Sequence, residues 1–184
     1  QSLDRPDIQH HFVIGLIDDH LRKLHYGYGY SCHVCLLRPY SRGTVSLAST
    51  EYNDAPLINP NFLNDNRDVD TLIKGAKMTQ NILNTPPLKK YQKREIYGVH
   101  SNLTDKEWEQ HIRNRADTIY HPVGTCKMGK DPLAVVNSSL KIRGLKNIRV
   151  ADASIMPTIT SGNTNAPTIM IGEKCATMIM DVHE

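Results

Sequence analysis

The sequence contains no long apolar run. Its longest apolar stretches, such as Leu16-Ile17 and residues 166–171, are far shorter than the roughly 20 residues that a membrane-spanning helix needs. It also shows no signal peptide, and it begins with Gln1 rather than Met, as a processed, excised or truncated product does. We therefore expect a cytoplasmic protein without a transmembrane segment, with peripheral membrane association of a longer parent left open.

Cysteine is scarce, with residues at positions 32, 35, 126 and 175 only, which is too few for a dense disulfide framework. Cys32 and Cys35 have the spacing of a metal or redox motif, but they fall in residues 30–37, whose pattern is that of a β-strand. Because residues i and i+3 of a strand project to opposite faces, the two thiols cannot share one zinc ion. We predict buried strand cysteines, a reducing compartment and no metal site.

The charge is small and widely spread. The formal net charge is +3, and the densest basic cluster is Lys89-Lys90 with Lys93-Arg94. Scattered basic residues of this kind are typical of a solvated surface rather than of a nucleic-acid-binding patch. We therefore expect no nucleic-acid partner.

Length and composition are those of an ordinary globular domain. A chain of 184 residues, 39% hydrophobic and 22% charged, can bury a substantial core. It shows no internal repeat or low-complexity linker, so we predict a single domain over residues 1–184. Strands are predicted over residues 12–17, 31–37 and 44–47, and the short links between them favour antiparallel neighbours.

Helices are indicated farther along the chain. Apolar residues at helical spacing predict a helix over residues 69–83, which Pro86-Pro87 should end. Thr104 and Glu107 form a capping box that predicts a second helix. A last helix should begin near Pro167, a residue suited to a first helical turn, and continue through Met180.

The remaining segments complete the predicted fold. Residues 53–64 are rich in Asn and Pro and are expected to be irregular, whereas residues 148–150 are predicted to form a short strand. Strands followed by helices are typical of the α+β class. We predict a mainly antiparallel sheet with helices packed on one face.

The segment 120–129, Tyr-His-Pro-Val-Gly-Thr-Cys-Lys-Met-Gly, carries the first candidate site. Pro122 fixes the backbone directly after His121, and Gly124 permits close approach by another group. Histidine exchanges a proton near neutral pH, so His121 is a candidate acid–base residue. A structural or solvent-exposed histidine remains the alternative.

A second polar cluster lies just before the last predicted helix. Asn163 and Asn165 follow Gly162 and precede Pro167. The N-terminus of a helix carries free N–H groups and about half a positive charge, so this loop can stabilise an anion. The alternative is helix capping by asparagine.

Several ordered segments together carry a family resemblance. They are residues 120–129, 140–144, 148–157, 162–167 and 171–174 and, upstream, 36–45 and 56–63. Through them the chain resembles the glucose-methanol-choline (GMC) oxidoreductase family, in its choline dehydrogenase-like and alcohol dehydrogenase-like branch. The resemblance covers almost the whole chain and corresponds to the C-terminal part of such enzymes.

The resemblance implies an FAD-dependent alcohol or choline dehydrogenase acting on CH–OH groups. In this family a primary alcohol loses a hydride from its α-carbon to flavin N5. His121 is similar to the base that takes the hydroxyl proton, and Asn163 falls where an amide orients the alkoxide. The cofactor-binding residues that the resemblance implies lie along the flavin side chain and its pyrimidine edge: Asp152, Ala153, Thr164, Asn165 and Ala166.

The chain departs from the family in one respect. Family members open with a Gly-rich fingerprint for the FAD pyrophosphate, and Gly27-Tyr28-Gly29 lacks its third glycine. We therefore expect a fragment without the Rossmann-like FAD half. Alone it should be inactive, bind FAD weakly or not at all, and expose apolar surface that favours self-association. Its partner would be the missing N-terminal half, present in the same chain or supplied in trans. The alternative is a non-catalytic remnant or interaction module that keeps the fold.

Overall fold

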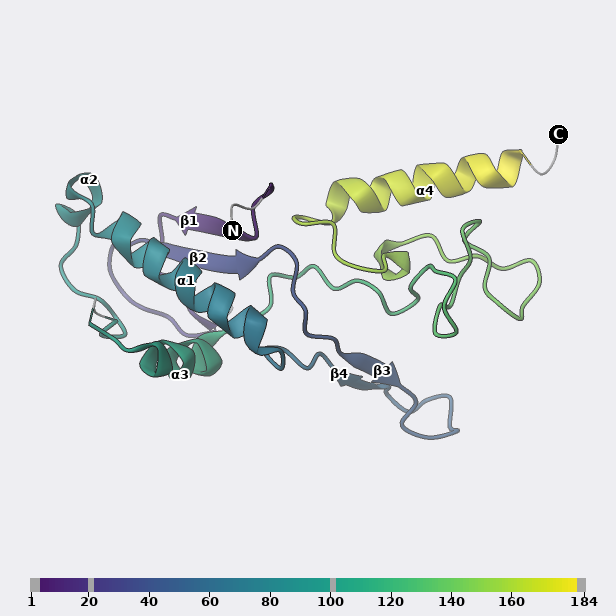
Figure 1. The fold of residues 1–184 in the computed structure, drawn as a ribbon, viewed down its shortest axis with the longest axis horizontal. Coiled ribbons are helices and arrows are strands. Elements are labelled where there is room, and N and C mark those ends of the chain that lie inside the picture. Colours follow the sequence, from purple (N-terminus) through teal and green to yellow (C-terminus); the bar gives the residue numbers. More distant parts are fainter. Residues whose placement is uncertain (1–3, 20–21, 100–101, 182–184) are drawn as a thin grey trace. The chain divides into compact units, whose positions relative to one another are not determined.

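The computed structural model describes residues 4–19, 22–99 and 102–181. It has an α+β architecture of short antiparallel sheets and helices (Figure 1). In chain order, its elements are β1 (Ile8–Val13), β2 (Ser31–Leu36), β3 (Thr44–Ser46), β4 (Leu57–Asn59), α1 (Asn66–Leu83), α2 (Pro86–Lys89), α3 (Asp105–Arg115), the 3-10 helix η2 (Ala153–Ile155) and α4 (Asn165–Met180). Within the described ranges, no helix is both long and apolar enough to cross a membrane.

The chain divides into two compact units. Unit 1 consists of Gln1–Arg42 and Asn61–Ile119, and unit 2 of Gly43–Pro60 and Tyr120–Glu184. Unit 1 holds β1, β2 and the first three helices, whereas unit 2 holds β3, β4, η2 and α4. This division does not decide whether the units form one domain, so the single domain over residues 1–184 stays a prediction.

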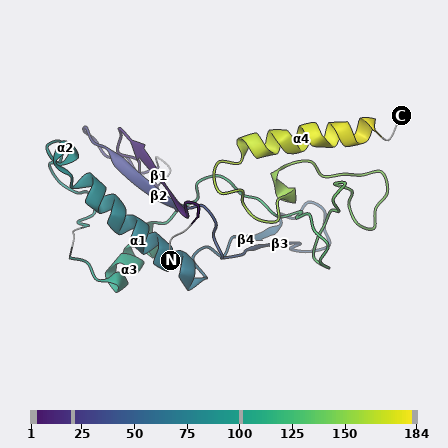
Figure 2. The same cartoon turned by 45° about the horizontal axis from the view of Figure 1, so that its top comes forward.

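In unit 1, α1 lies across the antiparallel pair of β1 and β2 (Figures 1 and 2). Gly75 of α1 is buried where the helix meets the sheet, and a Cβ atom on it would lie 2.8 Å from Val34 Cγ2 and 3.2 Å from Ile8 Cδ1. The missing side chain therefore lets the helix approach the two strands closely.

On the side of α3, the same helix forms a small apolar core. Val69 and Ile73 of α1 pack with Trp108 and Ile112 of α3, all at most 8% exposed. The predicted capping box is confirmed at the start of α3: the Thr104 hydroxyl accepts from the Glu107 N–H, and the Glu107 carboxylate accepts from the Thr104 N–H.

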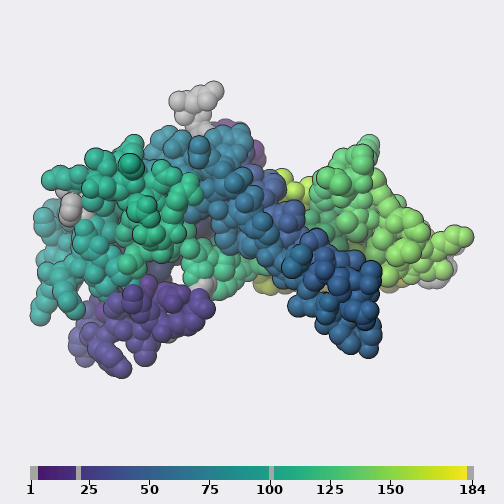
Figure 3. Space-filling view, turned by 90° about the horizontal axis from the view of Figure 1, so that it is seen from below, coloured from purple at the N-terminus to yellow at the C-terminus, as the bar shows by residue number. Residues whose placement is uncertain are grey.

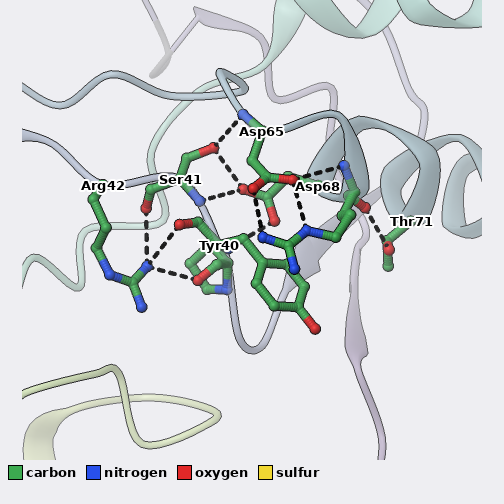
Figure 4. A network of polar contacts seen from close by, with 8 residues as sticks. Tyr40, Ser41, Arg42, Asp65, Asp68 and Thr71 are labelled. Carbon is green, nitrogen blue, oxygen red and sulfur yellow. Dashed lines mark hydrogen bonds and ion pairs between the residues drawn. The ribbon is translucent and has the colours of Figure 1, made fainter.

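A buried carboxylate joins α1 to the segment after β2 (Figure 4). Asp68 is only 2% exposed and accepts hydrogen bonds from the backbone N–H of Tyr40 and of Ser41, each at 2.8 Å, and from the Ser41 hydroxyl at 2.6 Å. The Ser41 oxygen in turn accepts from the Asp65 N–H at 3.1 Å. A loop without regular structure is thus fixed by side-chain acceptors instead of strand pairing.

The N-terminus of α1 is capped beside this carboxylate. The Asp65 side chain accepts from the Arg67 N–H, and it binds the Arg67 guanidinium with an Nη2–Oδ2 distance of 2.7 Å. This side-chain hydrogen bond lowers the pKa of the Asp65 carboxyl to about 2. The guanidinium also lies 3.7 Å from the centre of the Tyr40 ring, which is a cation–π contact.

In unit 2, β3 and β4 form an exposed antiparallel hairpin. All residues of both strands are exposed, including Val45 at 50%, Leu57 at 58% and Ile58 at 67%. The hairpin segment is visible as blue atoms on the surface in Figure 3. Exposed apolar side chains, expected from the sequence, are therefore present on this hairpin.

The strand predictions are confirmed at β2 and β3, with differences elsewhere. The first strand begins at Ile8 instead of residue 12, because pairing with β2 sets its bounds rather than the apolar run. The segment 53–64, expected to be irregular, contains β4, and β3 pairs with β4 and not with β2. Residues 148–150 contribute only an isolated bridge between Arg149 and Lys141.

The helix predictions are confirmed with small shifts. Helix α1 ends at Leu83, before Pro86, which then opens the short α2 as its first residue. Helix α4 begins at Asn165, two residues before Pro167, and ends at Met180 as predicted. Packing of the helices on a single sheet face stays a prediction.

We expect Gly75→Ala to destabilise unit 1. Alanine favours a helix by up to about 1 kcal/mol over glycine, but the added methyl group would meet Val34 and Ile8 at distances that force them apart, at a cost of about 1–3 kcal/mol. Gly172→Ala is the matched control, because Gly172 lies inside α4 with nothing within 4 Å of a Cβ atom. Urea unfolding should show loss for Gly75→Ala and gain for Gly172→Ala; equal gains would contradict the close approach.

We expect Asp68→Ala to cost about 1–3 kcal/mol of unfolding free energy, since it removes the buried carboxylate that accepts from the N–H groups of Tyr40 and Ser41. The control is Asp70→Ala, on the exposed side of the same helix, which should change stability by less than about 0.5 kcal/mol. Thermal or urea unfolding distinguishes them, and similar losses in both variants would contradict the role given to Asp68.

Candidate functional site

The candidate site is built on the small core of unit 2. This core lies against one side of α4 and is formed by Val136, Leu140, Ile155, Met156, Ile171 and Cys175, each at most 6% exposed except Ile171 at 7%. Ile171 and Cys175 are four residues apart on α4, so they form one buried stripe of the helix. All seven residues predicted for catalysis or cofactor binding are found in unit 2.

The loop that carries His121 is fixed by its backbone to the segment around η2. The Cys126 N–H donates to the Ser154 carbonyl at 3.0 Å, and the Met128 N–H donates to the Ile155 carbonyl at 2.7 Å. Gly124 has a φ of +90°, and a Cβ atom there would lie 3.2 Å from the Met156 carbonyl oxygen. The close approach expected at Gly124 is therefore confirmed.

Both polar clusters begin at residues with unusual backbone angles. Tyr120, directly before His121, has a φ of +64°, and Ser161, directly before Gly162, has a φ of +65°. Such angles are uncommon for residues with a side chain and cost about 1–3 kcal/mol each. Five other described non-glycine residues also have positive φ, namely Asp19, Asn61, Leu63, Leu140 and Asn147, so these angles describe the two loops without marking a site by themselves.

His121 is joined to the second cluster through Thr164. The Nδ1 atom of the half-buried His121 lies 3.1 Å from the Thr164 hydroxyl oxygen, across 43 residues of sequence, and Thr164 is 8% exposed. Thr164 is the N-cap residue of α4, yet its side chain makes no hydrogen bond to the helix. The hydroxyl that would ordinarily cap the helix therefore contacts the imidazole instead.

The other residues of the second cluster are open to solvent. Asn163, Asn165 and Ala166 are exposed. Because Thr164 occupies the cap position, the alternative that an asparagine caps this helix is wrong. The first turn of α4 presents its N–H groups without a side-chain cap, as an anion-stabilising helix end requires.

Asp152 and Ala153 lie at the start of η2. The exposed Asp152 carboxylate accepts from the Ser154 N–H at 2.8 Å and from the Ser154 hydroxyl at 2.5 Å, so it caps the short helix. Ala153 packs against the unit 2 core. The η2 segment also contacts α4.

Sequence reasoning located the motif residues but missed what links them. The bond between His121 and Thr164 joins segments 43 residues apart in the sequence, so no local sequence pattern predicts it. Thr164 was predicted only to bind the cofactor. The strain at Tyr120 and Ser161 also has no residue signature, since neither is a glycine. A threonine placed next to two asparagines before a helix was the available hint.

The cysteine pair lies on β2, as predicted. Cys32 and Cys35 are both free and partly buried, and burial raises the pKa of each thiol. Cys35 Sγ lies 3.6 Å from His11 Nε2 on β1. Among the residues that the structure describes, no group of three potential metal ligands is present.

The chain matches the family model described as GMC oxidoreductase over residues 39–172. It is 52% identical to the alcohol dehydrogenase [acceptor] of Pseudomonas putida over 177 residues, which cover 96% of this chain and 32% of that protein. It is 41% identical to the mitochondrial choline dehydrogenase of Mus musculus over 180 residues, covering 97% of this chain and 30% of the relative. The chain thus spans about a third of the length of these relatives.

Solved structures agree with the sequence comparisons. A formate oxidase structure from Aspergillus oryzae RIB40, described for its FAD modification, matches with a TM-score of 0.90 and 30% identity over 98% of this chain and 32% of that one. Pyridoxine 4-oxidase from Mesorbium loti matches with a TM-score of 0.85 and 31% identity over 96% of this chain and 35% of that one. With a family model covering most of its length and this fold, the chain belongs to the GMC oxidoreductase family, in its C-terminal domain.

Proposed function

We propose that this chain is the catalytic and substrate-binding portion of an FAD-dependent oxidoreductase that acts on a primary alcohol. The observation that carries the proposal is the contact of His121 with Thr164, which holds an imidazole at the uncapped N-terminus of α4. The relatives named alcohol dehydrogenase and choline dehydrogenase support the same reaction class.

The described residues fit one end of a flavin. The first turn of α4, a helix of 16 residues, offers N–H groups that no side chain caps, next to the exposed Asn165 and Ala166. These groups suit the electron-rich pyrimidine edge, and the η2 segment with Asp152 and Ala153 would lie along the flavin side chain through its backbone. When bound, FAD supplies the hydride acceptor for alcohol oxidation.

Within this proposal, His121 takes the proton of the substrate hydroxyl at an imidazole nitrogen. An imidazole is the side chain best matched to proton exchange near neutral pH. Its half-buried position limits the water around the ring. The backbone bonds of Cys126 and Met128 to the η2 segment keep the loop in place during that transfer.

Asn163 would orient the same oxygen. Its amide N–H donates a hydrogen bond but has no useful basicity, so it stabilises the alkoxide without competing for the proton. Its exposure, directly before the buried Thr164, leaves the amide accessible to a substrate. The division of roles therefore assigns proton transfer to His121 and orientation to Asn163.

We expect the chain alone to bind FAD weakly. The sequence has no Gly-rich fingerprint for the pyrophosphate, and the groups described above would contact only part of the cofactor. After incubation with excess FAD and gel filtration, the protein peak should show little absorbance near 450 nm. Stoichiometric retention of FAD by the isolated chain would contradict this expectation.

We expect His121→Ala to slow flavin reduction by alcohol about 10²- to 10⁴-fold in the holoenzyme that contains this chain, because the proton acceptor is lost. Stopped-flow absorbance of the bound flavin measures this step. Asn163→Ala should slow the step less. His33→Ala is the control, since His33 is exposed on β2 in unit 1 and should leave the rate unchanged.

Reduction of the His121→Ala enzyme at the normal rate would remove the proposed function. In that case the interaction-module alternative would take its place. Folding of each variant is checked by circular dichroism, so that loss of structure is not read as loss of chemistry.

A further inference from the structure

We propose that Thr164 is a positioning residue for His121: its hydroxyl holds Nδ1 of the imidazole, so that Nε2 is the nitrogen that receives the alcohol proton. This inference rests on the proposed function, because it takes His121 as the proton acceptor. It goes beyond the role of Thr164 expected from the sequence, where this residue was singled out for cofactor binding.

The hydroxyl is free for this role because the helix does not use it. An N-cap threonine ordinarily accepts a hydrogen bond from a backbone N–H in the first turn of its own helix. Thr164 makes no such bond, and its Oγ1 lies 3.1 Å from His121 Nδ1. The Thr164 hydroxyl oxygen therefore contacts the His121 imidazole instead of a backbone N–H of its own helix.

The anchor is rigid. Thr164 is β-branched, so its side chain has few rotamers, and it is only 8% exposed. Its carbonyl oxygen accepts from the Thr168 N–H at 3.0 Å and from the Thr168 hydroxyl at 2.6 Å. A hydroxyl held in this way can fix the orientation of a ring that lies in a loop.

The chemistry of the pair determines which ring nitrogen is basic. In neutral imidazole one nitrogen carries the proton and the other carries a lone pair. When Nδ1–H donates to the Thr164 hydroxyl oxygen, Nε2 keeps the lone pair and can accept the proton of an alcohol. After that transfer Nδ1 still carries its hydrogen, so the bond to Thr164 persists in both protonation states of the ring.

A hydroxyl differs from a carboxylate in this position. A carboxylate partner stabilises the protonated imidazole by its charge, as in serine protease triads. Thr164 carries no charge, so it orients the ring while adding no net charge beside a site where anionic character develops. The role is therefore one of orientation and tautomer, and the variants below separate it from simple packing.

Thr164→Val and Thr164→Ser form the test pair. Valine keeps the shape of threonine and removes the hydroxyl, whereas serine keeps the hydroxyl and removes a methyl group. If Thr164 serves packing alone, valine is the better replacement; if it positions His121, serine is. Thr177→Val is the control, because Thr177 is exposed on the same helix and its hydroxyl donates to the Glu173 carbonyl of that helix.

The first readout does not depend on activity. Long-range ¹H–¹⁵N spectra of the histidine-labelled chain at about pH 9, above the ordinary titration range of histidine, identify the tautomer of the His121 ring. We expect a protonated Nδ1 and an unprotonated Nε2 in the natural chain and in Thr164→Ser, and averaged signals in Thr164→Val. The opposite tautomer in the natural chain, averaged signals there, or an unchanged spectrum in Thr164→Val would each overturn the proposal.

The second readout is the rate of flavin reduction in the holoenzyme. Thr164→Val should lower the rate about 10- to 100-fold with KM little changed, while Thr164→Ser should restore most of the rate. A valine variant faster than the serine variant would overturn the positioning role. If His121→Ala leaves reduction intact, the proposed function fails, whereas the tautomer spectra still report on the contact itself. The two failures are therefore distinguishable.

Discussion

The backbone contact between the His121 loop and the η2 segment is the constraint on which the site depends. Unit 2 has little regular structure around its core, so two N–H groups, of Cys126 and Met128, and the close approach of Gly124 to Met156 set the path of the loop. This path ends beside the buried cap residue of α4. Without it, the histidine and the helix terminus would be two unrelated features of the chain.

Helices α1, α3 and α4, the three long helices among the described residues, differ in how their N-termini are capped. Helix α1 is capped by the Asp65 carboxylate and α3 by the reciprocal box of Thr104 and Glu107. Helix α4 also has a capping residue, Thr164, at this position, but that side chain contacts an imidazole. The missing side-chain cap costs α4 about 1 kcal/mol of stability, and it is missing at the end of the helix where the proposed chemistry takes place.

Sequence patterns predicted those features that depend on local interactions. Helices α1, α3 and α4 were predicted because apolar spacing, the capping box and a proline in the first turn act within a few residues, whereas the short α2 and η2 were not predicted. Strand β4 was missed because all three of its residues are exposed and its order comes from pairing with β3. Likewise, His121 and Asn163 were singled out from their motifs, whereas the contact of His121 with Thr164 depends on tertiary structure that no local pattern contains.

The division into units has a consequence for dissecting the chain. Because residues 43–60 belong to unit 2 while both flanking segments belong to unit 1, the polypeptide passes from one unit to the other three times. A protease that nicks any one of these crossings leaves the two units covalently connected. Separate expression of unit 2 would require joining Pro60 to Tyr120 through a new linker, so gene truncation alone cannot isolate the half that carries the histidine.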